Sequence, residues 1–154
     1  GQIKLSDEIK FLTDYLGLEQ LRFGNRFDFS FDIDEEVEED FIEIPSMLLQ
    51  PYIENAIIHG MRGLERKGEI VVGFRFDNDN DNKLICTVDD NGVGRQSVKR
   101  KKENTSSHKS LGMQITKDRL SSINKEESSS VEIIDKLNDK GEPMGTTVIF
   151  SIAV

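Results

Sequence analysis

The chain has 154 residues, a formal net charge of −9 and 36% hydrophobic content. That length and apolar content supply one hydrophobic core, so one domain is expected. The acidic balance argues against DNA or RNA as a partner, because nucleic-acid affinity comes mainly from clustered Lys and Arg. The single cysteine excludes an internal disulfide, and no run approaches the ~18 apolar residues that span a bilayer. We therefore expect these residues to lie in a soluble, reducing compartment, without membrane contact of their own.

A first helix is expected near residues 6–22. Ser6 is placed to cap it, because its side-chain oxygen can accept a backbone N–H of the first turn. Acidic residues follow in that turn, where the positive end of the helix dipole favours them. Ile9, Leu12 and Leu16 then repeat at spacings of three and four, so one side of the helix is expected to be buried. Leu18 and Leu21 are expected to extend this stripe.

A half-buried strand is expected at residues 27–33, where apolar and polar side chains alternate. The acidic run Glu35–Asp40 is expected to be a solvated loop and not a metal site. Ile70–Phe76 and Leu84–Val88 predict a hairpin around the polar turn Asp77–Asn82. This turn lacks the Gly and the Glu that a calcium loop requires, so calcium is rejected.

Residues 48–61 read LLQPYIENAIIHGM and predict a second helix. Its expected buried stripe follows spacings of three and four and consists of Leu49, Ile53, Ala56, Ile57 and Gly60. The polar residues off this stripe are Glu54, Asn55, His59 and Arg62. Pro45 suits the first turn of this helix, and Pro51 is expected to bend or restart it.

A glycine-rich turn follows the hairpin and reads Asp90-Asn91-Gly92-Val93-Gly94. Its glycines permit backbone geometry and close approach that a β-carbon would block. An Asn on a helix and an Asp on such a turn together suggest a nucleotide site. Farther on, residues 95–109 carry six basic side chains against one acid. A helix is expected at 112–123, and strands are expected near 131–136 and 146–153.

Four segments of the chain resemble motifs of the histidine kinase ATP-binding domain, in the order of that family. Residues 48–61 resemble the N box, and Asp90–Gly94 resembles the G1 box. Ser110-Leu111-Gly112-Met113 resembles the G2 box, and Gly145–Val148 resembles the closing strand. The superfamily includes gyrase, the Hsp90 chaperones and the mismatch-repair ATPases. The phrase IPSMLLQPYIENAIIHG is similar to LytS-type sensor kinases, so the resemblance covers nearly the whole chain.

The resemblance implies an α+β fold, a two-layer α/β sandwich in which helices pack on one face of a mixed β-sheet. This is the Bergerat ATP-binding fold. Residues 1–154 would form a single ATP-binding catalytic domain of a sensor histidine kinase. The N-terminal helix would lie within residues 1–24, and the ATP lid would lie at 95–110.

The resemblance also implies ATP and Mg²⁺ as ligands. Asp90 would accept a hydrogen bond from the adenine amine, whereas guanine would present a repulsive carbonyl oxygen. Thr146 would help through its hydroxyl and a water. Asn55 would ligate magnesium, because an amide oxygen is a hard ligand, and Glu54 is the candidate for assisting the histidine nucleophile. The other expected nucleotide-binding residues are His59, Gly92, Val93, Gly94, Leu111, Gly112 and Met113.

Departures from the family pattern limit the expected activity. Ile58 stands where many members have a phosphate-binding Lys, and Ser110 replaces the first glycine of G2, so weaker nucleotide binding is expected. Pro51 stands where the ATP-hydrolysing branches have a catalytic Glu, so autonomous hydrolysis is not expected. His59 and His108 are the only histidines, and they fall in the N box and the lid.

The phosphoacceptor histidine is therefore expected on a dimerisation segment absent from this chain. Phosphate would pass from there to a response regulator. The chain would be a cytoplasmic part of a membrane-anchored sensor. Two alternatives stay open. One is an anti-sigma-factor-type serine kinase, although the phrase IPSMLLQP favours the sensor kinase. The other is a degenerate, non-catalytic interaction module of the same fold, which Ile58 and Ser110 motivate.

Overall fold

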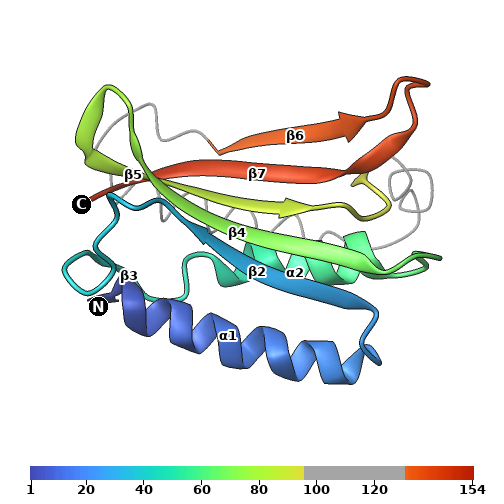
Figure 1. Cartoon of the computed structure of the whole chain (residues 1–154), viewed down its shortest axis with the longest axis horizontal. Helices are drawn as coiled ribbons and strands as arrows, with labels where there is room; N and C mark the ends of the chain where they lie inside the picture. The colour runs from blue at the N-terminus through green and yellow to red at the C-terminus, as the bar shows by residue number, and fades with distance from the viewer. Residues whose placement is uncertain (96–130) are drawn as a thin grey trace.

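The computed structural model describes residues 1–95 and 131–154. The elements in chain order are β1 (Gln2–Lys4), α1 (Leu5–Arg22), β2 (Phe27–Ile33), β3 (Glu43–Pro45), α2 (Gln50–Asn55), the π-helix η1 (Ala56–Met61), β4 (Gly68–Asp77), β5 (Asn80–Asp90), β6 (Glu132–Leu137) and β7 (Pro143–Ala153) (Figure 1). The helix expected at 112–123, the lid beyond Arg95, and the site residues Leu111, Gly112 and Met113 lie outside the described residues.

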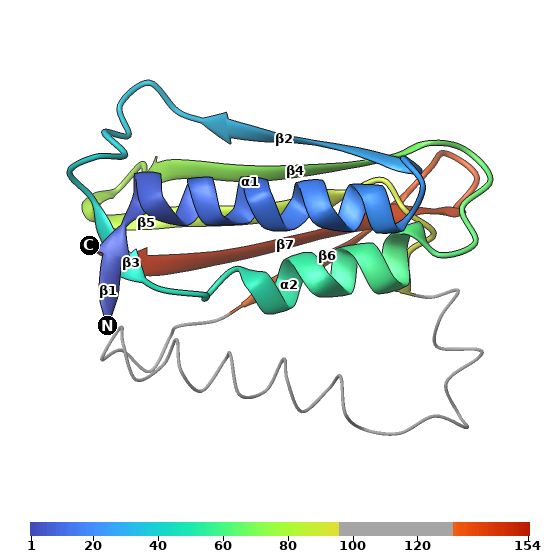
Figure 2. The same ribbon diagram turned by 90° about the horizontal axis from the view of Figure 1, so that it is seen from below.

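The main sheet has five strands in the order β2-β4-β5-β7-β6. β2 pairs with β4 in parallel, and the other neighbouring strands are antiparallel. The helices α1 and α2 lie side by side on one face of this sheet (Figure 2). The prediction of a mixed sheet with helices packed on one face is therefore confirmed.

The alternation of side chains along β5 fixes which residues enter the layer between sheet and helices. Leu84, Cys86 and Val88 are buried, and the residues between them are half-buried. Because the side-chain period of a strand is two, the next inward position is Asp90, the last residue of β5. An acid therefore ends a row of core residues. Cys86 is buried as expected, and burial raises the pKa of its thiol well above the ordinary range.

The helix α1 confirms the predicted first helix, but Ser6 does not cap it. The N-cap is Lys4, which makes no side-chain capping bond. The first backbone N–H groups instead reach the acidic loop, because Leu5 donates to the carbonyl of Ile42 and Ser6 donates to that of Glu39. Backbone carbonyls from a distant loop thus satisfy donors that a local side chain was expected to satisfy.

Pro45 does not begin the second helix, contrary to expectation. It ends β3, and in that strand it lies opposite Gln2 of β1 in a separate two-stranded antiparallel sheet. The helix α2 begins only at Gln50, with Pro51 in its first turn. The helix thus starts at the turn that contains Pro51, which is one of the two expected outcomes, and a first-turn residue has no intrahelical use for its backbone N–H.

The second half of this helix is wider than an α-helix. η1 follows α2 directly and has the i→i+5 geometry of a π-helix. The stripe predicted to be buried is confirmed at all five positions, Leu49, Ile53, Ala56, Ile57 and Gly60. Among residues 1–95 and 131–154, no helix has both the length and the hydropathy needed to cross a bilayer.

Two leucines of α1 test the assignment of its buried face. Leu16 is fully buried, whereas Leu18 is 67% exposed. The expected burial of Leu18 and Leu21 is therefore wrong, since Leu21 is exposed as well. We expect Leu16→Ala to lower the free energy of unfolding by about 2 to 5 kcal/mol, because it leaves a cavity under the sheet. Leu18→Ala, the matched control, should change it by no more than about 0.5 kcal/mol. Urea denaturation measures both, and equal effects would contradict the assigned packing.

Candidate functional site

The carboxylate of Asp90 lies between the sheet and η1. Asp90 is only 5% exposed. A β-carbon at Gly60 would lie 3.0 Å from its Oδ1 atom, so the absence of a side chain at position 60 lets the carboxylate lie against the helix. The sequence assigned Gly60 to the buried stripe but missed its contact with the acid. A small residue in the N-box helix is the signal that points to it.

Backbone donors and burial act in opposite directions on this carboxylate. Burial raises the pKa of Asp90 to about 6, while the backbone N–H groups of Gly92 and Thr146 and the positive charge of Lys136 act to lower it. The Gly92 N–H donates to Oδ1 at 2.9 Å. An ionised carboxylate has about four acceptor positions. The two backbone donors leave it with capacity to accept a further hydrogen bond from a ligand.

The glycine-rich turn packs directly on the backbone of η1. A β-carbon at Gly92 would lie 2.2 Å from the carbonyl oxygen of Gly60. The neighbouring Val93 N–H donates to that same oxygen at 2.9 Å. The carbonyl group of Gly60 thus holds the glycine-rich turn against η1, through a hydrogen bond and through close packing. In the structure the close neighbour of Gly92 is the backbone of Gly60, and its approach to a nucleotide stays a prediction.

Two further glycines shape the rim of this site. Gly145 has φ +106°, and a β-carbon there would lie 2.0 Å from the carbonyl oxygen of Asp90. The adjacent Thr146 is buried and pairs with Asp90 across β5 and β7. Gly94 has φ +83° and lies against Pro143. The structure therefore brings the predicted residues Asp90, Gly94 and Thr146 together at one end of the sheet.

Asn91 anchors the turn to β4. Its Oδ1 accepts the backbone N–H of Glu69 at 2.7 Å, and its own N–H donates to the carbonyl of Glu69 at 3.2 Å. The guanidinium of Arg66 donates to the carbonyl of Asn91. The sequence did not identify these contacts, because they depend on how β4 begins relative to the turn.

The three predicted site residues on the second helix are all half-buried. Asn55 is the last residue of α2, and Gly60 follows five positions later. Asn55 lies directly before η1, the helix that carries the contact between Gly60 and Asp90. Glu54 accepts a hydrogen bond from Gln50 at 3.1 Å, and His59 lies within η1.

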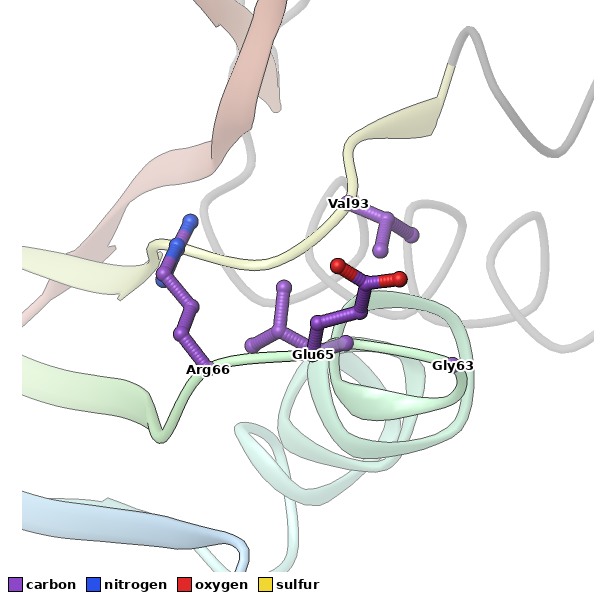
Figure 3. Close-up of a pocket in the computed structure, with 5 residues that line it drawn as sticks. Gly63, Glu65, Arg66 and Val93 are labelled. Atoms are coloured by element: carbon purple, nitrogen blue, oxygen red, sulfur yellow. The ribbon is translucent and has the colours of Figure 1, made fainter.

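A pocket of about 460 Å³ opens beside the turn, lined by Gly63, Leu64, Glu65, Arg66 and Val93 (Figure 3). It lies where η1 has ended and the chain runs toward β4. Val93 is the only one of these residues that the sequence assigned to the site. The loop of residues 63–66 therefore also borders the candidate site.

Arg95 has a partner that the sequence did not suggest. Its guanidinium binds the Asp135 carboxylate of β6 through two hydrogen bonds of 2.8 Å each. These two hydrogen bonds to Asp135 raise the pKa of Arg95 above its ordinary value. Arg95 was counted among the basic residues of the lid. In the structure its charge is paired with β6.

No family model matches the chain, but individual proteins do. The sensor histidine kinase YpdA of Escherichia coli is 38% identical over 93 residues, which are 60% of this chain and 15% of YpdA. The sensor protein LytS of Staphylococcus epidermidis is 33% identical over 92 residues, which are 60% of this chain and 15% of LytS. The chain thus spans about 15% of the length of these relatives, and the predicted resemblance to LytS-type sensor histidine kinases is confirmed.

Solved structures with the same fold are histidine kinase catalytic regions. The kinase domain of a blue-light activated histidine kinase from Erythrobacter litoralis has a TM-score of 0.63 and 15% identity, covering 98% of this chain and 61% of that one. The histidine kinase ThkA, in complex with the response regulator protein TrrA, has a TM-score of 0.59 and 16% identity, covering 99% and 41%. The predicted fold is confirmed.

Two glycine substitutions test the packing of the turn on η1. Gly92→Ala would push a β-carbon into the carbonyl of Gly60, so we expect it to lower the free energy of unfolding by about 1 to 3 kcal/mol. Gly17→Ala, in the middle of α1 with no neighbour within 4 Å, should instead raise it by about 0.5 to 1 kcal/mol. Denaturant titration of both variants measures these changes in the free energy of unfolding. If Gly92→Ala leaves the free energy of unfolding unchanged, the described contact between Gly92 and Gly60 is contradicted.

Proposed function

The chain is related in sequence to sensor histidine kinases and has the fold of their catalytic domains, and from this we propose that it binds ATP with Mg²⁺ and transfers the γ-phosphoryl group to a histidine. The acceptor histidine would lie on a dimerisation segment outside residues 1–154, and a response regulator would then receive the phosphate. The chain would form one catalytic domain in the cytoplasmic part of a membrane-anchored sensor.

The observation that carries the proposal is the buried Asp90 carboxylate with remaining acceptor capacity. An adenine amine would donate to it, whereas guanine would place a carbonyl oxygen there, and leaving such groups unpaired costs on the order of 1 to 3 kcal/mol. Thr146, which pairs with Asp90 across the strands, would add its hydroxyl through a water. Gly92, Val93, Gly94 and His59 would complete the described part of the nucleotide site.

Asn55 fits the role of a magnesium ligand. Its neutral amide oxygen is a hard donor, and Mg²⁺ commonly combines one or two protein ligands with phosphate oxygens and waters. Asn55 ends α2 and directly precedes η1, which carries the contact between Gly60 and Asp90. A metal held there would lie near a nucleotide whose base is on Asp90. Bound Mg²⁺ would offset the negative charge of the phosphates.

Glu54 would act on the acceptor histidine. It precedes Asn55 and its carboxylate is half-exposed on α2, so an imidazole approaching the phosphates would pass close to it. The response regulator enters the proposal because ThkA, a structural neighbour, has been solved with one.

Calorimetry with Mg²⁺ and a non-hydrolysable ATP analogue tests the role of Asp90. We expect binding by the unmodified chain, with the corresponding GTP analogue at least about tenfold weaker. Asp90→Asn should lose at least about tenfold in ATP affinity. Asp89→Asn is the matched control, because Asp89 faces away from the core and pairs with Lys136 and Thr147. No binding at millimolar nucleotide would overturn the proposal in favour of the degenerate module.

The same variant has a second expected effect, on stability without ligand. Since the pKa of Asp90 in the folded chain is raised to about 6, this group contributes stability below its unfolded pKa, near 4, and loses it as pH rises through 6. Asp90→Asn cannot ionise, so the variant does not lose stability as the pH rises. Its melting temperature relative to the unmodified chain should therefore increase between pH 4 and pH 7, and a constant difference would contradict the burial assigned to Asp90.

The metal role of Asn55 is tested by measuring nucleotide binding with Mg²⁺ and with EDTA. We expect Asn55→Ala to weaken binding by about tenfold or more when Mg²⁺ is present. In EDTA the variant and the unmodified chain should bind alike, because the amide then has no ion to ligate. Asn25→Ala, at an exposed turn, is the control. An equal loss in both conditions would show that Asn55 acts on the nucleotide directly.

A further inference from the structure

Asp90, Thr146 and Asp135 form a cross-strand row at one end of the sheet. Asp90 pairs with Thr146 across β5 and β7, and Thr146 pairs with Asp135 across β7 and β6. Residues directly opposite each other in neighbouring strands project from the same face. That face is the helix side, because Asp90 lies against Gly60 of η1. With strands about 4.8 Å apart, the Cα atom of Asp135 lies roughly 10 Å from that of Asp90.

The glycine-rich turn brings Arg95 to this cross-strand row. Gly94 lies against Pro143, at the start of β7, and Arg95 is the next residue. Its guanidinium reaches past β7 to β6, where it binds the carboxylate of Asp135 through two hydrogen bonds of 2.8 Å each. The side chain of Arg95 therefore lies across the start of β7, the strand that carries Thr146.

The two hydrogen bonds fix the plane of the guanidinium. A guanidinium is flat, and its N–H donors form a rigid fork that matches the two oxygens of a carboxylate. Two parallel bonds of this kind restrict rotation of the group out of that plane. The side chain of Arg95 is nevertheless 40% exposed. The pair thus presents a flat, oriented and accessible surface at the edge of the candidate site.

The attachment of β6 to the sheet does not depend on this pair alone. β6 (Glu132–Leu137) pairs with β7 along its length. On the opposite face of the sheet, Nζ of Lys136 donates to Oδ1 of Asp89 at 2.7 Å, and Asp89 also accepts a hydrogen bond from Thr147. A second ion pair therefore holds β6 from the outer side. The pair on the helix side is available for a role in ligand binding.

We propose that the guanidinium of Arg95, held by Asp135, is a stacking surface for the adenine base of the bound nucleotide. This inference rests on the proposed function. A base whose amine donates to Asp90 would lie beside Thr146, where the side chain of Arg95 crosses β7. Guanidinium planes stack on aromatic rings through dispersion and cation–π attraction, and nucleotide bases are bound on arginine in this way. Asp90 would select the base, and Arg95 would add affinity for any purine.

The carboxylate of Asp135 argues against a phosphate contact by Arg95. A guanidinium that is engaged by one carboxylate has fewer donors left for phosphate, and the negative charge beside it repels a second anion. A stacked base instead uses the face of the guanidinium, which hydrogen bonds in its plane leave open. The two roles therefore predict opposite effects on ATP affinity when Asp135 is neutralised.

Calorimetry with Mg²⁺ and a non-hydrolysable ATP analogue tests the inference. We expect Arg95→Ala to weaken binding about fivefold. The factor should be the same for ADP and for the GTP analogue, because stacking needs neither the γ-phosphate nor the amine. The loss should also persist at high salt, which screens a contact to phosphate. A loss that is confined to the triphosphates, or that disappears at high salt, would overturn the inference.

Two conservative variants separate stacking from charge. Arg95→Lys keeps a positive charge beside Asp135 but has no plane, so it should preserve the melting temperature and still bind the ATP analogue about fivefold more weakly than the unmodified chain. Asp135→Asn loses the charge that holds the fork, so it should weaken binding as well. If Arg95 contacts phosphate instead, Arg95→Lys restores the affinity and Asp135→Asn strengthens binding. Either result contradicts a stacking role.

Arg22→Ala is the matched control. Arg22 is also paired, since its guanidinium lies 3.5 Å from the carboxylate of Glu19, but it belongs to α1 and not to the cross-strand row. It should leave nucleotide affinity unchanged. If Arg95→Ala binds the ATP analogue as tightly as the unmodified chain, Arg95 does not contact the base, and this inference fails while the proposed function stands. If the unmodified chain binds no nucleotide, the proposed function itself fails.

Discussion

The site depends on one contact, between a buried carboxylate and the backbone of a helix. Asp90 enters the layer between sheet and helices because it continues the inward row of β5, and it fits there because Gly60 has no side chain. Burying an ionisable group is costly unless backbone donors compensate. The N–H groups of Gly92 and Thr146 supply part of that compensation, and burial still raises the pKa of Asp90. The glycine-rich turn and the start of β7 are the segments that bring these two N–H groups to the carboxylate.

The glycines around Asp90 follow from the same constraint. At Gly92 and at Gly145 an added β-carbon would collide with backbone atoms, of Gly60 in one case and of Asp90 in the other. Backbone cannot rearrange as a flexible side chain can, so substitution there displaces the turn or the strand. The π-helix η1 also affects how Gly60 lies relative to Asn55, because a π-helix turns less per residue than an α-helix. In an α-helix the five steps from Asn55 to Gly60 would leave Gly60 about 140° around the axis from Asn55.

The sequence predicts those elements of the fold in which apolar residues repeat at a short, regular spacing. Three features repeat every few residues, so the sequence predicts which face of each element is buried. They are the burial of Leu12 and Leu16, the alternation in β2 and the buried stripe of the second helix. The pairing of β1 with β3 joins two three-residue strands far apart in the chain, and strands so short carry no period. The bond from Arg95 to Asp135 likewise needs β6 in place. The bond between Gln50 and Glu54 was not predicted, although its spacing of four residues is helical.

The energetic cost of the site is also the source of its proposed selectivity. Without ligand, burial disfavours the ionised form of Asp90 and raises its pKa to about 6, so near neutral pH the folded chain carries a carboxylate with too few donors. A ligand amine would supply a donor and favour ionisation. A ligand carbonyl would add a second acceptor and increase the cost. In the proposed site, the same burial that lowers stability would therefore separate the two purines, and a more solvated acid at position 90 would gain stability and lose that discrimination.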